Sequence, residues 1–173
     1  MRAAKVRAMK LALALAALTS TVAFAQPAVP APDWSAFKPL LGEWVADPGS
    51  DGATGGFTLA AELGDRVLVR KNHADYPKSK DRPAFRHDDL MVIAREGEAL
   101  RATYWDNEGH RIDYGVTVEG PKFTFLSDAN KGPQFRLTYV VGEKGRLSIS
   151  FEIAPPGSNG AFKPYITATA HKK

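Results

Sequence analysis

Cysteine is absent from the 173-residue chain. This absence excludes disulfides, thiolate metal ligands and cysteine nucleophiles. It also excludes a lipid anchor attached through a cysteine thiol. Small exported domains use disulfides when their core is too small to be stable alone. A cysteine-free domain therefore needs a sizeable hydrophobic core, and a chain of this length can supply one in a single domain.

A long hydrophobic run is also missing. The apolar stretch Leu11–Leu18 is much shorter than the roughly 20 residues that a membrane-spanning helix requires. Basic residues precede it, and Ala23-Phe24-Ala25 follows. These features predict a secretory signal peptide over residues 1–25, cleaved after Ala25. We therefore expect an exported protein, periplasmic or secreted, without membrane insertion. Met9 is followed at once by Lys10, so translation could begin at Met1 or at Met9.

The mature chain lacks an excess of charge of either sign. The whole chain has 23 basic and 19 acidic residues. Four of the basic residues lie before the predicted cleavage site, which leaves 19 of each sign. A nucleic-acid-binding surface requires a positive field. We therefore expect no nucleic-acid partner.

Helical periodicity is scarce. Residues 26–32 are rich in Pro and Ala and predict a linker, and Asp33 can cap a brief helix that ends before Pro39. Beyond this point apolar residues alternate with polar ones, which is typical of strands. Ten strands are expected: Leu41–Asp47, Phe57–Glu62, Arg66–His73, Asp89–Arg95, Leu100–Trp105, Arg111–Val118, Lys122–Ser127, Gln134–Val141, Arg146–Ile153 and Tyr165–Ala170.

Most connections between these strands are short and contain Gly, Asn or Asp, which is typical of hairpin turns. Sequential hairpins predict an antiparallel up-and-down meander. Closure into a barrel would remove its two exposed edges. Residues 33–173 are therefore predicted to form one all-β barrel domain of about ten strands with a short N-terminal helix. The stretch Ala74–His87 is expected to be a long loop, and loops of that length are often functional.

The segment Phe37-Lys38-Pro39-Leu40-Leu41-Gly42-Glu43-Trp44 resembles the L-x-G-x-W opening of lipocalins, fatty-acid-binding proteins and nitrobindin-like barrels. Together with the runs at residues 104–109 and 135–139, it resembles a bacterial family of exported, lipocalin-like proteins of unknown function. The resemblance implies a calycin-like barrel in which Gly42 permits close packing and Trp44 plugs one end. It also implies an arginine over the Trp ring, for which Arg136 and Arg70 are both candidates.

Three tyrosines fall on the apolar faces of their strands: Tyr104, Tyr114 and Tyr139. One interpretation is that their hydroxyls bond to neighbouring strands or buried water. The other is that they orient a ligand in an apolar cavity. We expect a small hydrophobic or amphipathic ligand, and Phe125, Phe135 and Phe151 as apolar contacts. A ten-stranded barrel is wide enough to leave such a cavity.

Metal and cofactor binding are not expected. None of the four histidines (His73, His87, His110 and His171) forms a close-spaced pair with another. Nitrobindin-like barrels bind haem through a His on the last strand. Here that strand has only His171, at its end. The Val45-Ala46-Asp47-Pro48 segment also replaces the glycine-rich stretch of that family. Both departures disfavour haem.

No motif for nucleophilic catalysis or phosphate binding occurs, so no catalytic residue is assigned. An enzyme of the same fold would use Tyr and Arg acid–base chemistry, with Tyr104, Tyr139 and Arg136 as candidates. Arg136 and Tyr139 are separated by an odd number of residues, so they are expected on opposite faces. A filled barrel acting as an interaction module is a further alternative. The expected oligomeric state is monomer or homodimer.

Overall fold

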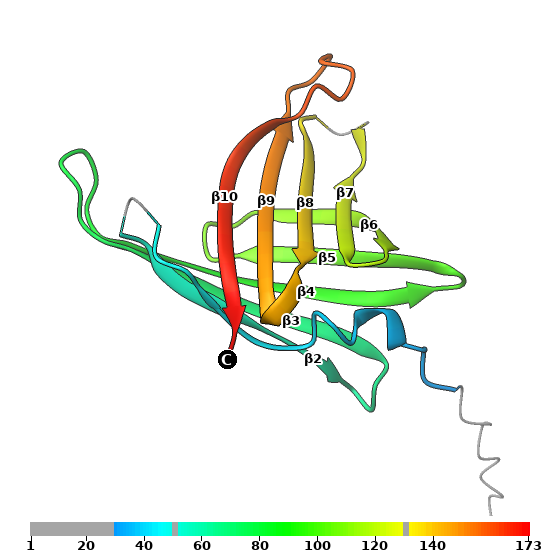
Figure 1. Cartoon of the computed structure of the whole chain (residues 1–173). Helices are drawn as coiled ribbons and strands as arrows, with labels where there is room; N and C mark the ends of the chain where they lie inside the picture. The colour runs from blue at the N-terminus through cyan, green and yellow to red at the C-terminus, as the bar shows by residue number, and fades with distance from the viewer. Residues whose placement is uncertain (1–29, 50–51, 130–131) are drawn as a thin grey trace, which may run out of the picture.

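The computed structural model describes residues 30–49, 52–129 and 132–173. The predicted signal peptide lies outside the described residues. Ten antiparallel strands form a closed barrel in the order β1-β10-β9-β8-β7-β6-β5-β4-β3-β2 (Figure 1). The strands are β1 (Gly42–Ala46), β2 (Thr54–Glu62), β3 (Val67–Tyr76), β4 (Phe85–Glu96), β5 (Ala99–Asp106), β6 (Arg111–Glu119), β7 (Lys122–Ser127), β8 (Gln134–Val141), β9 (Arg146–Ala154) and β10 (Lys163–Lys172).

The predicted fold class is confirmed. Each strand pairs with its neighbours in sequence, and β1 pairs with β10 to close the barrel. Among the described residues, the short 3-10 helices η1 (Ser35–Phe37) and η3 (Glu143–Gly145) accompany the strands. The first of them falls within the short helix expected after Asp33.

The prediction of a long loop at Ala74–His87 is wrong. Strands β3 and β4 stay paired outward as far as Tyr76 and Phe85, so their connection spans only residues 77–84. The rings of Tyr76 and Phe85 stack with centroids 4.5 Å apart, which favours the extra pairs. The resulting hairpin extends beyond the barrel wall (Figure 1).

The end of the barrel beside η1, which we call the closed end, is filled by side chains. Phe37 and Leu40 are each 1% exposed, and the Phe37 ring lies 5.3 Å from that of Phe123. Trp44 is also 1% exposed, and its Nε1 donates a hydrogen bond to the carbonyl oxygen of Leu40 at 2.8 Å. Trp34 Nε1 donates to the carbonyl oxygen of Asp65 at 2.9 Å, which ties η1 to the β2–β3 turn.

The cation over Trp44 is a lysine, so neither candidate arginine has that place. Lys172 Nζ lies 5.6 Å from the centre of the Trp44 ring, and the two residues are cross-strand partners in β1 and β10. Gly42 adopts a φ of +116°, and a side chain there would approach Lys172 Cε to 3.0 Å. Arg70 instead lies near the rings of Phe57 and Tyr139.

The opposite end, which we call the mouth, is surrounded by the β1–β2, β3–β4, β5–β6, β7–β8 and β9–β10 connections. An up-and-down barrel places alternate connections at opposite ends, so η1 and the mouth are separated by the length of the barrel. The beginnings of β4, β6 and β8 and the ends of β3, β5 and β9 therefore meet at the mouth.

Candidate functional site

A buried ion pair lies inside the barrel. Arg70 on β3 is 6% exposed and pairs with Asp89 on β4, whose side chain is 4% exposed. The Arg70 guanidinium also donates a hydrogen bond to the Tyr139 hydroxyl. Asn72 is the cross-strand partner of Asp89, and its Nδ2 donates to Asp89 Oδ2 at 2.7 Å. Three strands thus converge on one carboxylate and one guanidinium.

The protonation states of Arg70 and of its partner Tyr139 follow from their surroundings. Burial disfavours the charged form of Arg70, but Tyr139 and Asp89 outweigh it and raise the pKa of the guanidinium. Burial raises the pKa of Tyr139, against the opposing effect of Arg70. Arg70 is therefore a permanent cation and Tyr139 a neutral phenol. The Nε atom of Arg70 is buried and has no hydrogen-bond partner.

A second group of polar side chains continues from this pair toward the mouth. His87 lies two residues before Asp89, so it faces the same side of β4. Its Nε2 is 3.4 Å from Asp89 Oδ2 and 3.1 Å from the Tyr104 hydroxyl. Its Nδ1 is 2.8 Å from Glu108 Oε1, in the β5–β6 turn. The His87 side chain is 22% exposed, so solvent reaches it.

Tyr104 and Asp106 extend the group to the surface. The Tyr104 hydroxyl donates to Asp106 Oδ2 at 3.0 Å, and the same oxygen is 2.9 Å from His110 Nδ1. The Asp106 side chain is 3% exposed, whereas that of His110 is 64% exposed. Hydrogen bonds therefore connect the barrel interior to an exposed imidazole.

The ionisation of these two groups follows from their contacts. Burial, together with the nearby carboxylates of Asp89 and Asp106, raises the pKa of the Tyr104 phenol well above its ordinary value. Burial opposes ionisation of Asp106. Hydrogen bonds from the His110 backbone and ring and from Tyr104 outweigh it, and the pKa of Asp106 is lowered. Tyr104 is thus a proton donor beside an ionised carboxylate.

The residues that the sequence predicted as ligand contacts divide into two groups. Tyr114, Tyr139 and Phe125 are 3%, 1% and 0% exposed, and the Phe125 ring packs edge-on against both tyrosines. Burial also raises the pKa of Tyr114. Tyr104, Phe135 and Phe151 are only partly buried. Contact with a ligand stays a prediction for all six residues.

Phe135 and Phe151 stack with centroids 6.0 Å apart, at the mouth ends of β8 and β9. In the closed strand order β3–β5 and β8–β10 lie across the barrel from each other. The apolar wall of the mouth therefore faces the polar residues of β3, β4 and β5.

Arg136, the arginine candidate for acid–base chemistry, lies on the other face of β8. Its guanidinium bonds Glu152 at 2.7 and 2.9 Å and lies 4.0 Å from the centre of the Phe162 ring. The odd spacing from Tyr139 anticipated this separation. Arg70 takes the interior position instead.

Sequence reasoning identified Tyr104 and Tyr139 but assigned no interior role to the other members of the polar cluster, which are Arg70, Asn72, His87, Asp89, Asp106 and Glu108. A usable signal was present in β3, where Leu68, Arg70 and Asn72 alternate on one face, so that two polar residues extend an apolar series. The pattern alone does not indicate which strand supplies their partners. That information comes from the register of β3 with β4.

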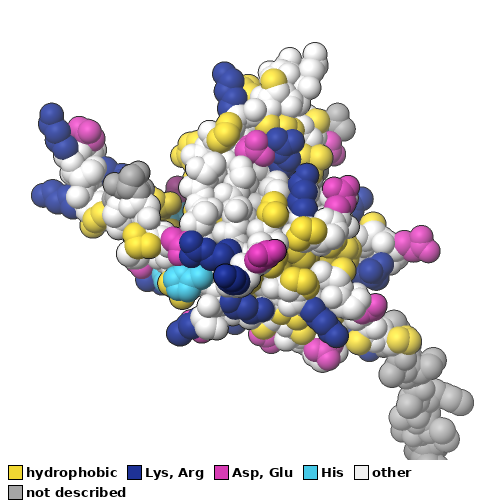
Figure 2. Space-filling view, viewed as in Figure 1, with side chains coloured by type: hydrophobic (Ala, Val, Ile, Leu, Met, Phe, Trp, Pro, Cys, Tyr) yellow, Lys and Arg dark blue, Asp and Glu magenta, His cyan; other side chains and the backbone are white. Residues whose placement is uncertain are grey.

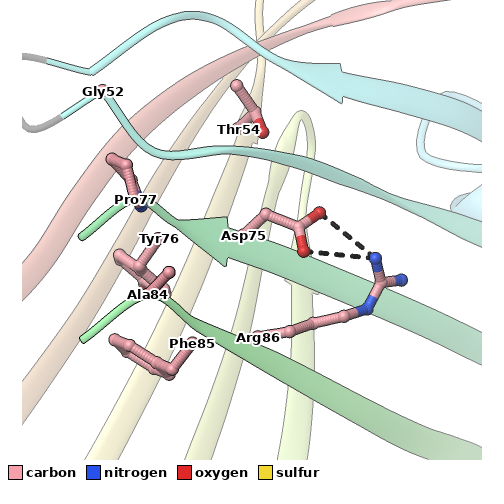
Figure 3. A pocket seen from close by; sticks show the side chains of 8 residues that line it. All are labelled: Gly52, Thr54, Asp75, Tyr76, Pro77, Ala84, Phe85 and Arg86. Carbon is pink, nitrogen blue, oxygen red and sulfur yellow. Dashed lines mark hydrogen bonds and ion pairs between the residues drawn. The ribbon is translucent and has the colours of Figure 1, made fainter.

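Hollows that are open to solvent lie at the surface of the described residues, among them the following two. The larger, of about 490 Å³, is found where the β3–β4 hairpin leaves the barrel, beside Gly52 and Thr54 (Figure 3). Its walls include the stacked Tyr76 and Phe85, and Arg86 bonds Asp75 at 3.2 Å. The smaller, of about 330 Å³, is lined by residues of β4 and β5, including the exposed Trp105.

Within residues 30–49, 52–129 and 132–173, no group of three or more His, Asp or Glu side chains is arranged to hold a metal ion. The same ranges contain no helix of the length and apolarity needed to cross a membrane. No protein-family model matches this chain, and no curated protein matches it.

Proposed function

We propose that this protein is an exported, calycin-like barrel that binds a small, uncharged amphipathic molecule at its mouth. The polar head of the ligand contacts His87, Tyr104 and Asn72. Its apolar body lies against Phe135 and Phe151. The L-x-G-x-W opening and the closed ten-stranded barrel both support the lipocalin-like assignment.

The observation that carries the proposal is a difference in exposure along the interior face. At the closed end, Leu68, Ile93 and Phe123 are completely buried. At the mouth, inward-facing apolar residues keep exposed surface, and Ile166 is 41% exposed although it pairs with Phe151. Apolar surface that faces inward yet remains wet is a candidate binding surface.

The charges near the mouth favour an uncharged ligand. Asp89 neutralises Arg70, and Asp106 and Glu108 are paired with His110 and His87. An anionic head would meet these carboxylates, and a cationic head would compete with two histidines and Arg70. A carbonyl or hydroxyl can instead accept from Tyr104 or Asn72.

Native mass spectrometry of the mature protein, recovered from the periplasm, tests the proposal. We expect a bound small mass that disappears on denaturation. Phe151→Asn should lose this mass because it places an amide on the apolar wall. Leu126→Asn is the matched control, since Leu126 lies on the outer face of β7 and is 39% exposed. A bare wild-type protein would contradict binding and favour the filled-barrel interaction module.

Export has its own test. The intact mass of the recovered protein should correspond to a chain that begins at Gln26, because the leader is predicted to be cleaved after Ala25. Substitution of Ala23 and Ala25 by Arg should leave an uncleaved precursor. A full-length chain confined to the cytoplasm would contradict the localisation.

A further inference from the structure

The contacts at the mouth form one uninterrupted hydrogen-bonded chain: Glu108–His87–Tyr104–Asp106–His110. The successive donor–acceptor distances are 2.8, 3.1, 3.0 and 2.9 Å. Its inner part contacts the barrel interior through His87 and Tyr104, and its outer end is exposed at His110. This series of hydrogen bonds therefore links a candidate ligand surface to bulk water.

The hydrogen atoms of this hydrogen-bonded chain can take two arrangements, and each of them leaves both His87 and Tyr104 paired. Glu108 only accepts, so His87 Nδ1 carries a hydrogen. When His87 is neutral, its Nε2 accepts from the Tyr104 hydroxyl. When His87 is protonated, Nε2 donates to the Tyr104 oxygen, and the hydroxyl turns to Asp106. Loss or gain of one proton at His87 thus switches the direction of the Tyr104 hydroxyl without leaving either group unpaired.

We propose that His87 and Tyr104 catalyse proton transfer on a small enolisable ketone bound at the mouth. This inference rests on the proposed ligand site and adds an activity to it. His87 acts as the general base and Tyr104 as the general acid. Glu108 is a positioning residue, because it contacts His87 Nδ1 and fixes the tautomer in which Nε2 carries no hydrogen and can accept a proton.

The proposed step balances without a cofactor. His87 Nε2 removes a proton from the carbon next to the carbonyl, and the C–H electron pair becomes the C=C bond. The carbonyl π pair moves to oxygen, which takes the Tyr104 proton. The phenolate then recovers a proton from His87 Nε2, its hydrogen-bond neighbour. The net change is ketone to enol, and both side chains return to their starting forms.

The surroundings of His87 suit this role. The charged and titratable groups in contact with it are Asp89 on its own strand, Tyr104 on β5 and Glu108 in the β5–β6 turn. Asp89 is shared with Arg70 and Asn72, so it is held in place. The protons exchanged in the reaction reach water through Asp106 and His110. The apolar wall of Phe135 and Phe151 favours an aryl or alkyl body on the ketone.

Deuterium exchange of phenylacetone (1-phenylpropan-2-one) in D2O tests this inference. Loss of its benzylic methylene signal is followed by proton NMR, and saturation transfer to its ring protons reports binding. We expect the wild-type protein to exceed the buffer rate. His87→Gln and Tyr104→Phe should each lower the protein-dependent rate about 100-fold or more, with the ring-proton binding signal retained.

The matched control is His73→Gln. His73 lies one residue from Asn72 on β3 and so faces outward, where its cross-strand partners are Gly56 and Asp88. Its substitution should leave the rate unchanged. Glu108→Gln should lower the rate and alter its pH profile, whereas a purely structural role would change neither once folding is verified by circular dichroism.

The outcomes separate the two proposals. Binding of phenylacetone with exchange at the buffer rate would overturn the proton-transfer activity and leave the ligand site standing. An unchanged rate in His87→Gln would also overturn the activity. If phenylacetone shows no saturation transfer, the site does not take neutral aryl ketones, and both this inference and the binding proposal for that class fail.

Discussion

At the residue scale, Arg70 and Asp89 form an ion pair whose side chains are only 8% and 4% exposed. Taking two charges out of water is costly, and their mutual attraction offsets this only when hydrogen bonds satisfy the remaining atoms. Asp89 accepts from Arg70 and Asn72, so its oxygens are well satisfied. The pair therefore depends on both partners being present.

Removal of one partner should be far more harmful than removal of both. Asp89→Ala leaves a buried guanidinium without its counter-charge, and we expect a loss of about 3–5 kcal/mol in the free energy of unfolding. The double variant Arg70→Met/Asp89→Ala should recover much of it. Urea unfolding followed by circular dichroism measures both. A double variant no more stable than the single one would contradict this account.

An exposed pair gives the matched comparison. Arg111 and Asp113 lie 3.0 Å apart, but their side chains are 61% and 55% exposed. Asp113→Ala should cost about 1 kcal/mol or less, because solvent screens surface pairs.

The Asp106 carboxylate predicts a dependence of stability on pH. Its pKa is lowered in the folded protein from the ordinary 3.8, so the folded state favours the ionised form. This contribution is present above pH 3.8 and is lost as the pH falls below it through the folded pKa. Wild type should therefore be more stable than Asp106→Asn at neutral pH, and the difference should shrink below pH 3.8. Thermal unfolding across this range measures it, and a difference that grows on acidification would contradict the assignment.

At the scale of elements, the pairing of β1 with β2 depends on a close backbone approach. A Cβ atom on Gly56 would lie 2.3 Å from the carbonyl oxygen of Trp44, and that oxygen is fixed in the strand. Strand β1 also contains Trp44, the side chain that fills the closed end. A glycine at this position is therefore needed for both the ladder and the plug.

Gly56→Ala should destabilise the protein by about 1–3 kcal/mol, since the two strands must separate to admit the methyl group. Gly115 on β6 is the control. A Cβ there meets its nearest atom, an Arg101 nitrogen, at 3.5 Å, which is ordinary contact. Gly115→Ala should leave the unfolding midpoint unchanged or raise it. Equal effects of the two substitutions would refute the close-approach argument.

At the scale of the whole molecule, closure is the dominant feature. Ten strands with one apolar face would otherwise leave two open edges, and the β1–β10 pairing removes them. The β3–β4 hairpin departs from this compact arrangement. Its tip carries the exposed Lys78, Lys80 and Arg82, and Figure 2 shows basic side chains gathered there.

The hairpin tip should be dispensable for folding. Replacement of residues 78–83 by Asn-Gly keeps the stacked Tyr76–Phe85 pair and shortens an exposed loop. We expect the unfolding free energy to change by no more than about 1 kcal/mol, because loop-closure entropy depends weakly on length. Thermal and urea unfolding test this. Collapse of the fold would show that the tip contributes contacts to the barrel.

The sequence by itself determined the ten strands and their order of pairing. Alternation is a local property with a period of two, so it predicts strand β8 at Gln134–Val141 and the inward faces of Tyr114 and Tyr139, as the structure has them. Turn residues then fixed an antiparallel meander. The sequence does not indicate the long pairing of β3 with β4, because the charged and proline-rich residues near it are typical of a loop.

Only the tertiary structure decided which side chains meet inside. Three different strands supply Arg70, Asp89 and Tyr139. The contact between His87 and Glu108 forms because β4 pairs with β5, which brings the β5–β6 turn beside the beginning of β4. The cation over Trp44 is Lys172 because barrel closure brings the last strand beside the first. Such contacts depend on register and closure, which are set by the packing of the whole barrel, whereas the alternation that marks a strand is set by its own residues.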